Sequence, residues 1–240
     1  MKQILTLMTI YGIILFCACS ADNLSAPIEY DLKQTLNSAS TTGSYTGYLL
    51  PDGNDLSKIP QDPKNPLTIE KIELGKMLFF ETGLALDPMN ETQKETYSCS
   101  SCHVPSCGFM PGRAQGVADG GIGFGTFGDV RWQNPLYEDE ELDVQGARPL
   151  NLMNVAYVTN TSWSGQFGGN NANIGTEHLW ANDPATLVNH LGYSGLESQN
   201  IEGFHLHRLV VNKEVTDDLG YTPLFDAAFP DFSAEERYSE

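Results

Sequence analysis

The residues with the clearest chemical meaning are two cysteines and a histidine in the segment Cys99-Ser100-Ser101-Cys102-His103. This is the C-x-x-C-H spacing, in which two thiols add to the two vinyl groups of one porphyrin and the adjacent histidine binds the iron. A zinc site would need a second Cys/His pair, and the remaining histidines offer no convincing spacing for one. A redox-active C-x-x-C would lie in a β-α-β setting, which is absent here. The motif therefore predicts one covalently bound c-type haem, with His103 as the proximal iron ligand.

The N-terminal residues 1–19 have the pattern of an export signal. Lys2 precedes a largely apolar run, Ile4 to Phe16, which is too short to span a bilayer but suits the core of a signal peptide. The run closes with Phe16-Cys17-Ala18-Cys19, which resembles a bacterial lipoprotein processing site. We therefore expect a lipoprotein signal peptide, a lipid on Cys19, and export to the periplasmic side of the cell envelope, where the lipid anchors the chain to the membrane. Secretion without a lipid is the alternative.

Residues 20–66 have the composition of a flexible tether. The run Ser38–Ser44 contains too little apolar surface to order itself, and four prolines between residues 51 and 66 stiffen the approach to the domain at 67–240. The net charge of −18 excludes nucleic acid as a partner, because phosphates would repel the chain. The acidic surface either attracts a basic partner protein or serves solubility alone.

The segments around the haem motif predict a mainly α fold, a cytochrome-c-like helical domain with long glycine-rich loops. Thr68 is the expected N-cap of a helix over 69–80, and Gly83 ends it. Taken alone, its apolar stripe indicates only a face that packs in the hydrophobic core. Because the haem motif follows, the stripe is also expected to form a wall of the porphyrin pocket. The stripe consists of Ile69, Ile72, Met77 and Phe80.

The chain after His103 is predicted to be loop, since eight glycines fall between residues 108 and 128. Within it, residues 123–128 match the dinucleotide fingerprint G-x-G-x-x-G, but no apolar strand leads in and no helix leads out, so this interpretation is rejected. Helices are expected again over 184–191 and 222–229, each with proline at its start. A capping box at Ser233–Glu236 begins another helix, and we expect the chain to continue beyond residue 240.

Several segments together resemble the N-terminal half of bacterial di-haem cytochrome c peroxidases, from about Leu74 to Asp231. In that family each half is a small helical domain, the N-terminal haem is the peroxidatic one, and a second haem collects electrons. The resemblance implies hydrogen peroxide as substrate, a small electron-donor cytochrome or cupredoxin as partner, a tryptophan between the haems at Trp163, and calcium at the domain interface. The matching segments are Leu74–Phe80, Ser98–His103, Arg148–Asn154, Trp163–Gly165, Leu196–Gln199 and Phe225–Pro230.

The chain departs from the family pattern at three places. It has no second C-x-x-C-H, so a second haem is expected in a missing part of the protein. Residues 104–177 contain no histidine to serve as the removable sixth iron ligand, so either the iron is open or Met110 caps it. The third departure covers the calcium site, where Asn151 is the nearest oxygen donor to the displaced position, together with the distal residues.

The third departure concerns the distal residues. Gln199 resembles the family's distal glutamine, at a spacing from Trp163 that implies an insertion. The family's distal glutamate falls at Leu209, which cannot transfer a proton, so His205, His207 or Glu214 would have to replace it.

Three functions follow from these observations. The first is a cytochrome c peroxidase, with Trp163, Gln199, His205 and His207 as catalytic residues. The second is a lipid-anchored electron-transfer cytochrome without substrate turnover. The third is a related di-haem oxidase that acts on another substrate.

Overall fold

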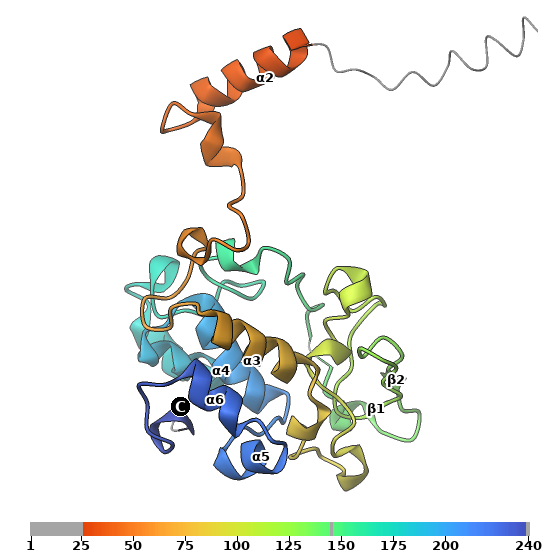
Figure 1. Ribbon diagram of the computed structural model, residues 1–240. Coiled ribbons are helices and arrows are strands. Elements are labelled where there is room, and N and C mark those ends of the chain that lie inside the picture. The colour runs from red at the N-terminus through yellow and green to blue at the C-terminus, as the bar shows by residue number, and fades with distance from the viewer. Residues whose placement is uncertain (1–25, 145, 239–240) are drawn as a thin grey trace, which may run out of the picture. The chain divides into compact units, whose positions relative to one another are not determined.

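A computed structural model describes residues 26–144 and 146–238 of the chain (Figure 1). It contains two compact units, residues 1–53 and 54–240. The predicted signal peptide and the lipidation site at Cys19 lie outside the described residues. None of the helices in the described ranges is long and apolar enough to cross a membrane.

The first unit contains regular structure within the segment predicted as a flexible tether. Helix α2 (Ala26–Ala39) is followed by a 3-10 turn at Tyr45–Tyr48. The backbone N–H of Tyr45 donates to Oδ1 of Asn37 at 2.6 Å, which ties the turn to the helix. The Ser/Thr-rich run covers only the end of α2 and the link to the turn, so its composition did not indicate the structure of the residues around it.

Residues 54–66, also assigned to the tether from sequence, pack into the second unit. The carboxylate of Asp62 is 2% exposed and accepts the backbone N–H of Ser194 at 2.6 Å. Lys64 donates through Nζ to the carbonyl of Leu191 at 2.7 Å. The start of the domain at residue 67 was therefore placed too late, because these contacts join residues about 130 positions apart.

Helix α3 (Ile69–Phe80) begins as predicted, but Glu81 caps its C-terminal end and the expected stop, Gly83, lies in the 3-10 turn that follows. Thr68 accepts the backbone N–H of Lys71 at 3.2 Å, which is the expected N-cap. The buried face is different from the predicted stripe: Leu74 is 3% exposed and packs with Tyr221 and Phe225. Ile69, Ile72 and Met77 are 59%, 38% and 50% exposed, so the prediction that they line the core is wrong.

Three further α-helices follow in the C-terminal part, and α6 packs against α3 (Figure 1). They are α4 (Gly195–Leu206), α5 (Lys213–Asp218) and α6 (Thr222–Ala228). The expected helix at 184–191 is present between its Asp183 cap and Gly192, wound as a 3-10 helix. The capping box is also confirmed, since Glu236 N–H donates to Ser233 Oγ at 3.3 Å, although only a short turn at Glu236–Tyr238 follows.

The segment between α3 and α4 is long loop broken by short 3-10 turns, as the glycines predicted. It contains one two-stranded antiparallel sheet, in which β1 (Gly121–Ile122) pairs with β2 (Trp132–Gln133). Residues 123–128 lie in the connection between these two strands, and no helix follows them directly. The remaining 3-10 turns of the second unit are Leu56–Lys58, Thr82–Leu84, Glu91–Gln93, Cys99–Ser101, Pro105–Cys107, Asp139–Glu141, Val155–Tyr157, Asn171–Asn173 and Glu177–Asn182. The mainly helical fold class is confirmed.

Candidate haem site

The haem motif forms one tight 3-10 turn at Cys99–Ser101. The backbone N–H groups of Cys102 and His103 both donate to the carbonyl of Cys99, at 3.2 and 3.1 Å. Cys99 and Cys102 are free thiols, and burial raises the pKa of Cys99 to about 11 and that of Cys102 to about 12. The turn therefore holds both thiols and the imidazole within five consecutive residues, as thioether attachment and iron ligation require.

The His103 ring is held by a backbone carbonyl. Its Nδ1 lies 3.1 Å from the oxygen of Phe109, and burial lowers its pKa, so the neutral ring is favoured. We assign the proton to Nδ1, which donates to this carbonyl and leaves the Nε2 lone pair for a metal. Met110 follows Phe109 directly and is 36% exposed, and its role as the sixth iron ligand stays a prediction.

Two glycines let the following loop approach the motif closely. A Cβ on Gly116 would lie 2.6 Å from the Cys102 sulfur. Gly128 has a φ of +78°, and a Cβ there would collide with the carbonyl oxygen of Ser100. The loop is also packed on α3 through aromatic rings, since Phe79 meets Phe109 at 5.9 Å between ring centroids. These features fit a cofactor enclosed by the loop and joined to the motif.

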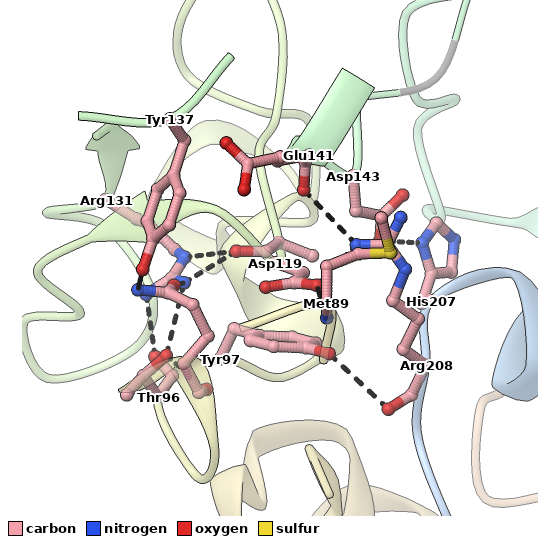
Figure 2. A network of polar contacts seen from close by, with 12 residues as sticks. Met89, Thr96, Tyr97, Asp119, Arg131, Tyr137, Glu141, Asp143, His207 and Arg208 are labelled. Atoms are coloured by element: carbon pink, nitrogen blue, oxygen red, sulfur yellow. Dashed lines mark hydrogen bonds and ion pairs between the residues drawn. The ribbon is translucent and has the colours of Figure 1, made fainter. Parts of the chain in front are cut away.

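Arg131 holds the segments on either side of the motif together. The side chain is 1% exposed and donates to the carbonyls of Ala118, Thr96 and Gly123 and to Oε1 of Gln93 (Figure 2). Its guanidinium also lies over the Tyr97 ring, with Cζ 5.4 Å from the centroid. Burial lowers the pKa of Arg131 to about 10, which still leaves it protonated at neutral pH.

Two buried aspartates and two basic side chains form a second cluster (Figure 2). Nδ1 of His207 lies 2.7 Å from Oδ2 of Asp143, and Arg208 forms an ion pair with Asp119. The backbone N–H of Asp143 donates to the carbonyl of Asp119 at 3.0 Å, which places the two acids side by side. Met89 N–H donates to Oδ2 of Asp119 at 2.7 Å, and Oδ1 of this carboxylate is buried without a partner in the described chain.

The Asp143–His207 pair adjoins the haem motif. The carbonyl of Asp143 accepts the backbone N–H of Ala118 at 3.2 Å, and Ala118 belongs to the hydrophobic cluster against which Cys99 and Cys102 pack. His207 is the C-cap of α4, and Arg208 takes a left-handed conformation with φ +57°. The resulting chain reversal lets His207 and Arg208 reach the two aspartates.

The other predicted site residues lie in different surroundings. The side chain of His205 is 78% exposed and lies 4.0 Å from Oε2 of Glu202. Trp163 is 88% exposed. Gln199 is half-buried on α4, and Oδ1 of Asn151 accepts the backbone N–H of Met153 at 2.6 Å. Of the four predicted catalytic residues, His207 is the one whose contact, with Asp143, leads to the hydrophobic cluster that packs against the motif.

Sequence reasoning missed Asp119, Asp143 and Arg131. Asp119 lies in the glycine-rich stretch, and Asp143 follows the acidic run at residues 138–141. Arg131 follows the glycine-rich stretch, and no sequence signal distinguishes it from Arg113 within that stretch. Among the described residues, no three His, Cys, Asp or Glu side chains are grouped to hold a metal ion, and calcium stays a prediction.

Comparison with known proteins identifies the family. Residues 69–240 match the family model described as di-haem cytochrome c peroxidase. A 62-residue segment is 39% identical to "Methylamine utilization protein MauG" of Methylorubrum extorquens, over 26% of this chain and 16% of that protein. A 110-residue segment is 28% identical to "Cytochrome-c peroxidase IdrP1" of Denitromonas iodatirespirans, over 46% of this chain and 22% of that protein. No solved structure matches the chain. Because the family model covers most of the chain, the chain belongs to the di-haem cytochrome c peroxidase family, which carries c-type haem.

Proposed function

We propose that this chain forms the peroxidatic haem domain of a cytochrome c peroxidase. The reaction is the reduction of hydrogen peroxide to two waters, with two electrons from a small donor cytochrome or cupredoxin and two protons. The observation that carries the proposal is the geometry of Cys99, Cys102 and His103, with His103 Nδ1 held by the Phe109 carbonyl at 3.1 Å. Cys99 and Cys102 would attach the haem and His103 would bind its iron. A haem in this place supplies an iron centre that exchanges electrons with a bound oxidant.

His207 transfers the proton in this proposal. With its Nδ1–H donated to Asp143 at 2.7 Å, His207 has a free Nε2 lone pair that can accept a proton from peroxide. The buried carboxylate of Asp143 stabilises the protonated ring, which can then return the proton to the departing oxygen. The proposal is supported by the pair's position beside the motif, and it assigns to His207 the task that Leu209 cannot perform.

The electrons enter from outside this domain. Trp163 is 88% exposed and is proposed to contact the part of the protein that holds the second haem. The chain's net charge of −18 favours a basic donor protein. The proposal includes export and lipidation at Cys19, because a periplasmic enzyme anchored at the membrane surface would meet such donors there. It also includes a calcium ion near Asn151.

The test uses the haem-loaded chain with its haem reduced beforehand. Added peroxide should reoxidise the haem rapidly, followed at its main absorption band, and the reaction needs no second haem. The variant His207→Gln should slow this reaction by roughly 10²-fold or more, whereas the exposed His178→Gln should react like the wild type. Equal rates for both variants would refute the role of His207.

The same measurement separates the second candidate function. The relative named for methylamine utilization shows that likeness to this chain extends beyond proteins named as peroxidases. An electron-transfer cytochrome would have two strong axial ligands, show a low-spin spectrum in both oxidation states and remain reduced when peroxide is added. That outcome would contradict the peroxidase proposal.

A further inference from the structure

Arg113 carries a buried hydrogen-bond donor that no described residue accepts. Its Nε donates to the carbonyl of Pro111 at 3.0 Å and its Nη2 to the carbonyl of Gly128 at 3.1 Å. Nη1 is shielded from solvent and makes no hydrogen bond within the described chain. Buried polar atoms are nearly always paired, and an unpaired donor on a charged group is especially costly. A missing acceptor is therefore expected next to Nη1.

The missing acceptor is expected to be an anion. The chain has 31 acidic and 13 basic residues, so carboxylates are plentiful. Arg208 and Arg237 pair with Asp119 and Asp226, yet among the described residues no carboxylate forms an ion pair with Arg113. The buried Arg131 differs as well, because each of its nitrogens has a protein acceptor.

The guanidinium of Arg113 is fixed beside the turn that carries the motif. Its Cζ lies 5.6 Å from the centre of the Trp132 ring, and its Nη2 donates to Gly128, where a Cβ would collide with the carbonyl oxygen of Ser100. Three residues after Arg113, Gly116 is so close to the Cys102 thiol that a Cβ would lie 2.6 Å from the sulfur. The segment that carries Arg113 therefore borders the place where a haem joined to Cys102 begins.

A c-type haem brings carboxylates of its own to this place. It carries two propionates, and the pyrrole ring that receives the second thioether adjoins a ring that bears one of them. Arginine is the side chain best suited to bind a carboxylate, because its planar donors remain charged and match the two oxygens. We propose that Nη1 of Arg113 donates a charge-assisted hydrogen bond to a propionate of the haem attached at Cys102, which makes Arg113 a positioning residue for the haem. This inference rests on the proposed haem site.

The contact should affect the haem in two ways. It fixes the propionate, and with it the orientation of the porphyrin against the glycine-rich loop. It also places a positive charge near the iron, which disfavours the ferric state and raises the reduction potential.

The experiment compares the haem-loaded wild type with Arg113→Gln, Arg113→Lys and the exposed control Arg148→Gln. Resonance Raman spectra report the propionate bending band, which moves to lower frequency when a hydrogen bond to the propionate is lost. We expect this shift in Arg113→Gln, a smaller shift in Arg113→Lys, and none in Arg148→Gln. The reduction potential should be lower in Arg113→Gln than in Arg148→Gln.

An unshifted band in both Arg113 variants would overturn the inference while leaving the haem site intact. Arg113→Lys gives the same decision alone if Arg113→Gln does not fold. A wild-type chain without covalent haem would instead refute the proposed haem site, so the two failures are distinguishable.

Discussion

Replacing Arg131 with methionine tests whether this buried guanidinium holds the haem loop together. The side chain joins residues 93–96, just before the motif, to residues 118–123 after it. Methionine has a similar reach but no donor. The substitution would leave the carbonyls of Ala118, Thr96 and Gly123 without their Arg131 bonds in the interior.

The expected loss can be worked from these contacts. A hydrogen bond to a charged group contributes about 1.5–3 kcal/mol, and an acceptor left unpaired adds to the loss. Since such contributions are not additive, we expect the free energy of unfolding to fall by about 4 kcal/mol. For a domain of this size that corresponds to a fall in Tm of about 8–16 °C.

The assay is denaturant unfolding of the haem-loaded chain, followed by far-ultraviolet circular dichroism. Arg148→Met is the matched control, because Arg148 is exposed and its loss should change stability by no more than about 0.5 kcal/mol. If Arg131→Met stayed within about 1 kcal/mol of the wild type, Arg131 would not organise the loop as described.

Three further predictions concern the site and its surroundings. Asp143→Asn should slow reoxidation by peroxide about tenfold, because a neutral acceptor stabilises protonated His207 less than a carboxylate does. Gly116→Val should lower the haem-to-protein ratio, because the new side chain would occupy the space beside the Cys102 sulfur, at an overpacking cost of about 1–3 kcal/mol. Glu197→Gln should stabilise the chain at pH 7 but not below pH ~4, because burial raises the pKa of Glu197 and its ionised form opposes folding.

Each of these three predictions has a control and a result that would contradict it. The exposed Asp139→Asn should leave the peroxide reaction unchanged, and an equal slowing in both variants would remove the special role of Asp143. Gly75→Ala is the control for haem content, since nothing lies within 4 Å of a Cβ at Gly75. For Glu197→Gln, an identical change in unfolding free energy at pH 7 and at pH ~4 would show that ionisation is not the cause.

Local signals in the sequence predicted much of the scaffold. The Thr68 cap, the Pro223 helix start and the Ser233 capping box each depend on residues within one helical turn, and the structure contains all three. The haem motif is equally local. The buried face of α3 was not predictable, because it depends on α6, about 150 residues later, and Leu74 rather than Ile72 meets that partner.

The cluster of two buried aspartates and two basic side chains could not be predicted from the sequence, for the same reason. The contact of His207 with Asp143 joins residues 64 positions apart, and that of Arg208 with Asp119 joins residues 89 positions apart. No periodicity links them. The sequence could not show which of His205 and His207 contacts a buried acid. The turn at Arg208 decides this, because it leaves His205 in solvent and directs His207 to Asp143.

The most direct test of the account is the mass of the denatured chain produced in cells that attach c-type haem. We expect an increase by the mass of one haem, retained after acidic solvent extraction and lost when Cys99 and Cys102 are both replaced by serine. A chain of unmodified mass, or a haem that is extracted freely, would show that this motif does not bind haem covalently.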